Sequence, residues 1–150
     1  MTVANVMEAL RDRGMDRLHS IAASASVADA VELMATNEIG AVVVSTEDAL
    51  VGGIFTERDV MMRVVRAGLD PRRTLLSMVM TRDVHFVSPG TTLEAALALM
   101  YVHRHRHLLV IDGPQIHGMV SMRDLVYQIV RRGQDAFTAA VHRGEPGAAP

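Results

Sequence analysis

Two pairs of residues, each a hydroxyl followed three positions later by a carboxylate, are the best suited in this chain to bind a ligand. Thr56 precedes Asp59, and Ser121 precedes Asp124, which places the second pair 65 residues after the first. Each pair follows a short apolar run and precedes an apolar-rich segment, a pattern that indicates the junction between a strand and a helix. We therefore expect the same chemistry at two corresponding places in the fold.

Each pair has two interpretations. A hydroxyl at the N-cap and a carboxylate at the third helical position form a capping box, which only stabilises the helix. The same helix end also presents unpaired N–H groups and the positive end of the helix dipole, which suit a phosphate. A carboxylate there can accept hydrogen bonds from both hydroxyls of a ribose. The interpretations are compatible, and the residues alone leave both open.

The sequence around each pair also repeats, which predicts two similar units. In the first unit we expect an extended segment at Ile21, a helix over 26–36, a strand over 42–44, a returning strand through Ile54 and Phe55, and a helix from Thr56 to Gly68. In the second we expect an extended segment at Val87, a helix after Thr92, strands over 108–111 and 116–120, and a last helix that ends near Gly133. Each unit therefore has the order β-α-β-β-α.

The predicted fold class is α/β. One such unit buries too little apolar surface alone, so we expect the two to pack about a pseudo-two-fold axis as one compact module. The first repeat is placed at residues 15–69 and the second at residues 79–133. Residues 1–14 are expected to form a short N-terminal helix and loop, and residues 134–150 a partly disordered tail.

Composition excludes several classes of protein. The chain has no Cys, which excludes disulfides, thiol catalysis and thiolate metal sites. Its formal net charge of −2 gives no basic field, so nucleic acid is an unlikely partner. The longest apolar run, residues 95–102, is far too short to span a bilayer, and residues 1–10 lack the pattern of a signal peptide. We therefore expect a cytoplasmic protein without a membrane partner.

These features together resemble a tandem pair of cystathionine-β-synthase (CBS) domains that stands alone, without an attached enzyme or channel. The resemblance covers about residues 15–132. It rests on the segments Ile39–Val44, Thr56–Asp59, Arg106–Val110 and Ser121–Asp124, which occur in register within two β-α-β-β-α patterns. One departure is Leu109, where the family usually has Pro; Leu can continue the strand, so the fold is not affected.

The resemblance implies a regulatory module, not an enzyme. Such pairs bind adenosine-containing ligands, such as AMP, ADP, ATP, NAD or S-adenosylmethionine, in clefts between the repeats, and they associate into flat dimers. The nucleotide would then be a regulatory ligand and not a catalytic cofactor. The implied nucleotide-binding residues are Gly40, Ala41, Thr56, Arg58, Asp59, Arg106, His107, Ser121, Arg123 and Asp124.

The residues before the two central strands differ between the repeats. Gly40 and Ala41 are small and would let a flat adenine approach the backbone, although Gly40 also suits a helix C-cap. Arg106 and His107 stand 66 positions later and could hold phosphates, although basic residues also complement the end of a helix. We expect both repeats to accept adenosine, and the repeat with Arg106 to bind phosphorylated ligands more tightly.

Catalytic and metal-binding residues are not predicted. No nucleophile and base occur at a spacing that suggests a reaction, because caps or ribose contacts account for the Asp residues. His103, His105 and His107 alternate and would share one face of a strand. They lie where a helix gives way to a strand, however, and their spacing is not that of a known metal site.

Two further functions remain open on the sequence. The chain could be a constitutive dimerisation or scaffold module with no physiological nucleotide, or a weak nucleic-acid binder through Arg104 and Arg106. A homodimer is expected, because Met61, Met62, Leu125 and Tyr127 cannot all face one small core. An unidentified protein target is the remaining partner expected of a regulatory module.

Overall fold

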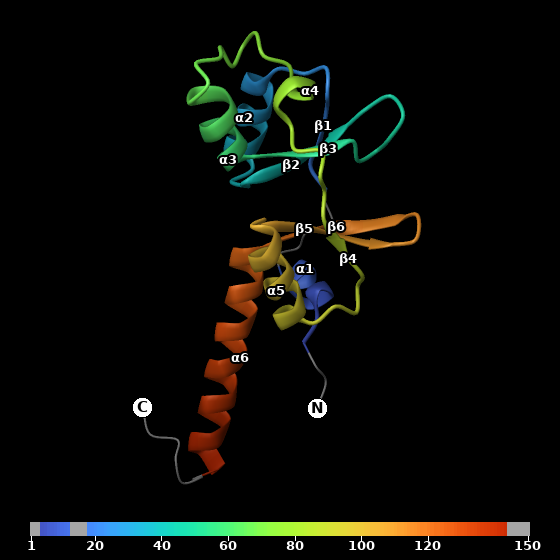
Figure 1. Cartoon of the computed structure of the whole chain (residues 1–150). Coiled ribbons are helices and arrows are strands. Elements are labelled where there is room, and N and C mark those ends of the chain that lie inside the picture. The colour runs from blue at the N-terminus through green and yellow to red at the C-terminus, as the bar shows by residue number, and fades with distance from the viewer. Residues whose placement is uncertain (1–3, 13–17, 144–150) are drawn as a thin grey trace. The chain divides into compact units, whose positions relative to one another are not determined.

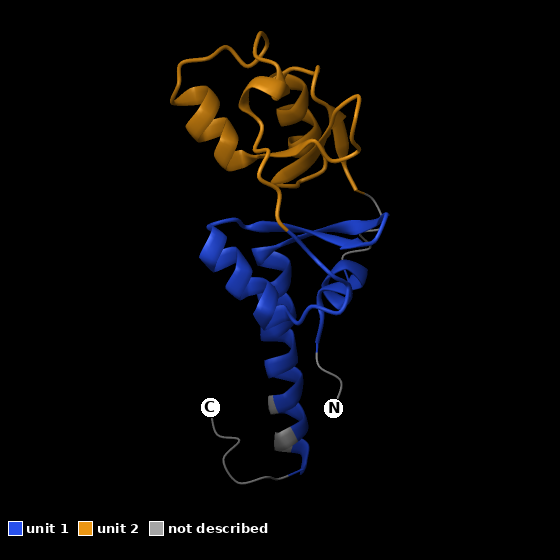
Figure 2. Cartoon of the chain, turned by 45° about the vertical axis from the view of Figure 1, so that its right-hand side comes forward, with its two compact units in different colours: residues 1–16, 86–150 blue, residues 17–85 orange. Residues whose placement is uncertain are grey.

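The computed structural model of the chain describes residues 4–12 and 18–143. The chain divides into two compact units, coloured separately in Figure 2. Residues 17–85 form the repeat-1 unit, which is orange, and residues 1–16 with 86–150 form the repeat-2 unit, which is blue. The start of the chain therefore belongs with the second repeat. The disorder predicted at the C-terminus falls partly on residues 144–150, which lie outside the described residues.

The repeat-1 unit contains a sheet of three strands in the order β1-β2-β3 (Figure 1). β1 (Ser20–Ala22) runs parallel to β2 (Ala41–Ser45), and β3 (Gly53–Thr56) pairs antiparallel with β2. The helices are α2 (Val27–Thr36), α3 (Glu57–Asp59), the π-helical segment η1 (Val60–Val65), which continues α3, and α4 (Leu76–Val79). Ala41 pairs with Thr56, so β2 begins beside the end of β3.

The repeat-2 unit contains the corresponding sheet, in the order β4-β5-β6. β4 (Phe86–Val87) runs parallel to β5 (His107–Asp112), and β6 (Gln115–Ser121) pairs antiparallel with β5. The helices are α5 (Leu93–His103), α6 (Met122–Arg143) and, from the start of the chain, α1 (Val6–Asp12). His107 pairs with Ser121, which reproduces the relation between Ala41 and Thr56.

The helices begin where the sequence supplies a cap. The hydroxyl of Ser26 accepts a hydrogen bond from the N–H of Asp29, whose carboxylate accepts one from the N–H of Ser26, so α2 starts with a capping box. The hydroxyl of Thr92 accepts from the N–H of Ala95 at the start of α5. Such caps are local, so their position follows from the sequence alone.

Each unit has its own apolar core. In the repeat-1 unit, α2, β2, β3 and η1 bury side chains together with α4, from which Leu76 and Val79 contribute. In the repeat-2 unit, α5, β5, β6 and α6 do so together with α1, from which Val6, Ala9 and Leu10 contribute. A short helix thus completes each core.

The predicted fold class and the two β-α-β-β-α repeats are confirmed, with two local differences in where helices end. The helix after Thr56 becomes π-helical at Val60 and ends at Val65; Gly68, where φ is +71°, lies in the turn that follows. The last helix does not end near Gly133 but continues to Arg143. Leu125 is fully buried in the repeat-2 core, whereas Met61, Met62 and Tyr127 are exposed, so these four side chains do not all face a core, as expected.

Candidate functional site

Thr56 and Asp59 form the predicted capping box at the junction of β3 and α3. The N–H of Asp59 donates to Oγ1 of Thr56 at 3.2 Å. The N–H of Thr56 donates to Oδ2 of Asp59 at 3.1 Å, and the Thr56 hydroxyl lies 3.2 Å from the same oxygen. The helix-cap interpretation is therefore correct for this pair, and it leaves open whether the pair also binds a ligand.

The Asp59 carboxylate has further partners that the sequence did not predict. The hydroxyl of Thr81 lies 3.1 Å from Oδ1 and 3.2 Å from Oδ2. Nε of Arg63 lies 3.5 Å from Oδ1. The residue is only 7% exposed. Asp59 is thus a buried carboxylate at which β3, η1 and the segment after α4 meet.

Ser121 and Asp124 form the same box at the junction of β6 and α6. The N–H of Ser121 donates to Oδ2 of Asp124 at 2.8 Å, and the N–H of Asp124 donates to the Ser121 hydroxyl at 3.2 Å. Asp124 is 9% exposed. The two predicted junctions therefore share one local geometry.

The residues before the central strands lie beside these boxes. The carbonyl of Gly40 accepts from the N–H of Glu57 at 3.0 Å, and the carbonyl of Arg106 accepts from the N–H of Met122 at 2.8 Å. Since Ala41 pairs with Thr56, Gly40 and Ala41 lie next to the first box. Arg106 and His107 occupy the same places at the second box.

Arg58 and Arg123 occupy matching positions in the first helical turn of α3 and α6. Both side chains are exposed to solvent. The structure therefore assembles the predicted residues into two groups, one in each unit: Gly40, Ala41, Thr56, Arg58 and Asp59; and Arg106, His107, Ser121, Arg123 and Asp124.

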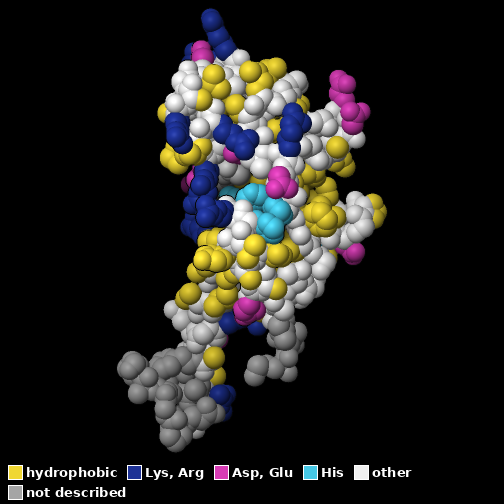
Figure 3. All heavy atoms as spheres, viewed as in Figure 1, with side chains coloured by type: hydrophobic (Ala, Val, Ile, Leu, Met, Phe, Trp, Pro, Cys, Tyr) yellow, Lys and Arg dark blue, Asp and Glu magenta, His cyan; other side chains and the backbone are white. Residues whose placement is uncertain are grey.

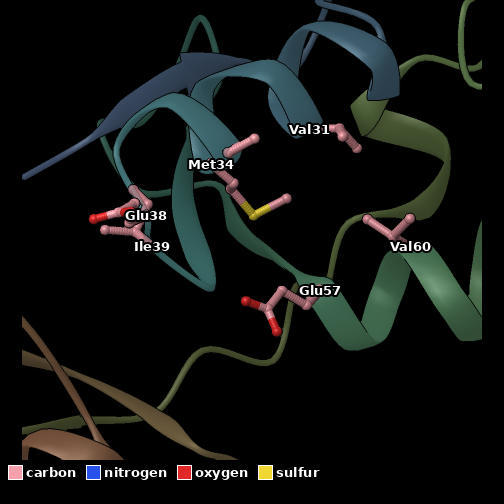
Figure 4. A pocket seen from close by; sticks show the side chains of 7 residues that line it. Val31, Met34, Glu38, Ile39, Glu57 and Val60 are labelled. Carbon is pink, nitrogen blue, oxygen red and sulfur yellow. The ribbon is translucent and has the colours of Figure 1, made fainter.

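A pocket of about 430 Å³ lies between α2 and α3 in the repeat-1 unit (Figure 4). Its lining is mainly apolar, and Figure 4 shows Met34 pointing into the space that separates α2 from Val60. Glu38 and Glu57 add two carboxylates. Because like charges repel, these carboxylates disfavour an anionic group near the first box.

The alternating histidines do not line up on one strand. α5 ends at His103, Arg104 has a left-handed φ of +56°, and β5 begins only at His107. Within residues 4–12 and 18–143, no group of three or more His, Asp or Glu side chains is placed to hold a metal ion. The alternation in sequence is therefore not an alternation on one face of a strand.

Thr81 and Arg63 are the residues of this site that sequence reasoning missed. Both reach Asp59 from segments outside the motif, and Arg63 also donates to the carbonyls of Val79 and Met80, at 3.3 and 3.0 Å. The i,i+4 spacing of Asp59 and Arg63 could have indicated their ion pair, whereas no local pattern marks the contact with Thr81. The nearest signal is Gly53, whose missing side chain makes room for the Thr81 carbonyl.

The repeated fold and the two junctions define a tandem CBS-domain protein, and the chain belongs to this family. The sequence model of the CBS domain matches residues 6–66 and 76–131. The matched segments include every predicted site residue of both repeats.

Known proteins with similar sequences or structures carry the same domains. A CBS domain-containing protein of Arabidopsis thaliana, CBSCBSPB2, is 33% identical over 111 residues, which cover 74% of this chain but only 21% of the plant protein. A protein with CBS domains from Burkholderia ambifaria, described as a candidate signal-transduction protein, is 34% identical; the match covers 85% of this chain and 95% of the other, with a TM-score of 0.80. A hexameric CBS-CP12 protein from cyanobacteria is 25% identical over 98% of this chain and 93% of that one, with a TM-score of 0.74.

No helix within residues 4–12 and 18–143 is both long and apolar enough to cross a membrane.

Proposed function

We propose that this protein is a non-catalytic regulatory module that binds adenosine-containing ligands at its strand–helix junctions. The observation that carries the proposal is the repeated box itself, in which a hydroxyl and a carboxylate stand at a helix N-terminus beside the first residues of a buried strand. The regulatory role is supported by the description of the Burkholderia protein, which refers to signal transduction.

The chemistry of such a ligand suits the groups present. A carboxylate near the helix start can accept from both ribose hydroxyls, and the helix N-terminus favours a phosphate. Arg106 is exposed and precedes β5, where its guanidinium can bind phosphate oxygens through two parallel hydrogen bonds. Adenosine would thus be held by the box, and phosphates by the arginine.

A signal from the ligand requires an interface that responds to it. Each unit has exposed apolar side chains that could form such an interface: Met61 and Val65 on η1, and Tyr127 and Val130 on α6. Figure 3 shows hydrophobic side chains, coloured yellow, at the surface of the chain. We propose that these side chains are covered in a homodimer, and that a ligand acts by binding two forms of that dimer with different affinity.

The alternative is a scaffold that dimerises and binds no nucleotide. Melting of the purified protein with millimolar adenosine, AMP, ATP, NAD or S-adenosylmethionine distinguishes the two. A ligand that binds only the folded state stabilises it by about 2.7 kcal/mol at 100 times its dissociation constant. A rise in melting temperature with at least one of these ligands supports the proposal, whereas no rise with any of them supports the scaffold.

Arg106→Ala tests the phosphate contact by calorimetry. We expect ATP to lose more affinity than adenosine, and the difference between the two ligands to shrink as salt rises, because salt screens the charge. Arg72→Ala, which removes an exposed arginine that belongs to neither group of predicted site residues, is the matched control. An equal loss for adenosine and ATP would mean that Arg106 only supports the fold.

A further inference from the structure

The pocket between α2 and α3 has an apolar end and an acidic end. Val31 and Met34 line it from α2, and Val60 lines it from the segment that continues α3. Glu38 follows the end of α2, and Glu57 is the first residue of α3. In Figure 4 both carboxylates lie to the left of Val31 and Val60. The volume of about 430 Å³ is in the range of small-molecule sites.

The acidic end of the pocket lies beside the first box. Glu57 directly follows Thr56, and its N–H donates to the carbonyl of Gly40 at 3.0 Å. Ile39, which also lines the pocket, directly precedes Gly40. A ligand held at the box through its ribose can therefore place a flat base against the apolar lining, and its remaining substituent near the two carboxylates.

The two carboxylates are available to such a substituent. Both side chains are exposed, and within residues 4–12 and 18–143 neither carboxylate has a hydrogen bond or an ion pair. Arg58 is the next residue after Glu57, but it is not among the described residues that line the pocket. The acidic end can therefore attract a positive charge on a ligand.

The repeated fold does not require these carboxylates. Glu38 has a left-handed φ of +52°, a conformation in which any side chain costs free energy and which Gly adopts without strain. Its counterpart 66 positions later, Arg104, has a φ of +56° and the opposite charge. The counterpart of Glu57, 65 positions later, is Met122. The pair of carboxylates is thus a property of the first repeat and not of the repeated pattern.

Charge distinguishes the adenosine-containing ligands at this pocket. AMP, ATP and NAD carry a phosphate next to the ribose, which the carboxylates repel. S-adenosylmethionine carries a positively charged sulfonium at the same position and has no phosphate. A unit charge at about 4 Å in water changes affinity roughly fivefold. Two exposed carboxylates, partly screened by salt, therefore amount to roughly tenfold.

We propose that this pocket selects adenosine derivatives with a positively charged group in place of the phosphate, of which S-adenosylmethionine is the type. The inference rests on the proposed function and deepens it, because it names the class of ligand that the first repeat binds. The base packs against the apolar end, where the flexible Met34 side chain adapts to it. Glu38 and Glu57 then determine the specificity of this repeat.

The methyl group of Met34 gives a signal from the pocket itself. Met34 is 5% exposed and lines the pocket, so its resonance in a protein with isotope-labelled methionine methyl groups should move when the pocket is filled. Its loss in Met34→Leu identifies it. We expect S-adenosylmethionine to move it at the lowest concentration. S-adenosylhomocysteine, which lacks the methyl group and the positive charge on sulfur, should need roughly tenfold more, and AMP more still.

Replacing the two carboxylates should remove this preference. The double variant Glu38→Gln with Glu57→Gln should bind S-adenosylmethionine and S-adenosylhomocysteine with nearly equal affinity. Glu47→Gln is the matched control, because it removes an exposed carboxylate in the turn between β2 and β3 that does not line the pocket, and it should keep the preference. Rising salt should reduce the preference in wild type.

The outcomes separate this inference from the proposed function. The selectivity is overturned, with adenosine binding still established, if AMP or S-adenosylhomocysteine moves the Met34 resonance at as low a concentration as S-adenosylmethionine. A double variant that keeps the preference, or ligands that raise the melting temperature without moving Met34, would overturn it as well. If no adenosine-containing ligand raises the melting temperature or moves a methionine resonance, the proposed function itself fails. Melting of every variant without ligand shows that each is folded.

Discussion

Gly53 permits the close approach of Thr81 to β3, and replacing it with Ala tests how tightly this contact is packed. A Cβ at residue 53 would lie 2.7 Å from the Thr81 carbonyl oxygen and 3.0 Å from Sδ of Met80. An ordinary contact begins near 3.4 Å. The Met80 side chain can rotate away, but the Thr81 carbonyl cannot, because the backbone of Thr81 is hydrogen-bonded to that of Ile54. The Gly53→Ala variant must therefore shift the Thr81 backbone.

The size of the effect follows from the contacts that such a shift weakens. Overpacking of a core typically costs about 1–3 kcal/mol. The two backbone hydrogen bonds between Ile54 and Thr81 are each worth about 0.5–1.5 kcal/mol. Replacing Gly with Ala also lowers the conformational entropy of the unfolded chain, which raises the free energy of unfolding by about 0.4–1 kcal/mol. We expect a net loss of about 1–3 kcal/mol, or roughly 3–10 °C in melting temperature for a chain of this size.

Thermal melting followed by circular dichroism measures this loss. Gly133→Ala is the matched control, because Gly133 lies within α6 and a Cβ there meets nothing within 4 Å. Ala is a better helix former than Gly by about 1 kcal/mol, so the control should melt higher than wild type. If Gly53→Ala melts at or above the wild-type temperature, the Thr81 segment is not held as described.

Three further variants test the packing of α1 and the proposed dimer. Asp12→Ala should destabilise the protein by about 1–3 kcal/mol in denaturant melts, because it leaves the amide of Gln128, which is 5% exposed, without its acceptor; the exposed Asp135→Ala should change little. Met61→Glu and Tyr127→Glu should shift sedimentation toward the monomer, because each places a charge on a side chain that is 58% or 60% exposed in one chain and is proposed to be covered in the dimer. Leu50→Glu, in the turn between β2 and β3, is the control, and a monomeric wild type would contradict the dimer.

The parts of the fold that the sequence predicted are those decided by neighbouring residues. Ser26, Thr56 and Thr92 were predicted to start helices because a cap is completed within three positions, and the structure has each of these caps. The buried strands were predicted from runs of β-branched and aliphatic residues, which pack on both faces of a sheet. The predicted site residues are brought together because each box lies at a strand–helix junction.

The parts that the sequence did not predict depend on distant contacts. Gly68 and Gly133 are equivalent in sequence, yet Gly68 lies in the turn after η1 whereas Gly133 lies within α6. Around Gly133, Arg131 binds Asp12 and Arg132 binds Glu8, so α1 helps to keep α6 helical through a residue of low helix propensity. The contact of Asp59 with Thr81, 22 positions away, is non-local in the same way, whereas its contact with Arg63 is an i,i+4 pair along one helical segment. Patterns that cover one helix at a time cannot contain this information.

The placement of α1 in the repeat-2 core has a consequence for the order in which the chain can fold. The repeat-1 unit is one continuous stretch and has all its parts once residue 85 has been synthesised. α1 is synthesised before the repeat-1 unit, but its buried partners on α5, β5, β6 and α6 lie some 80 to 120 residues later. Closing so long a loop is slow compared with forming local contacts. Among the described helices and strands, α1 must therefore wait longest after its synthesis for its native neighbours.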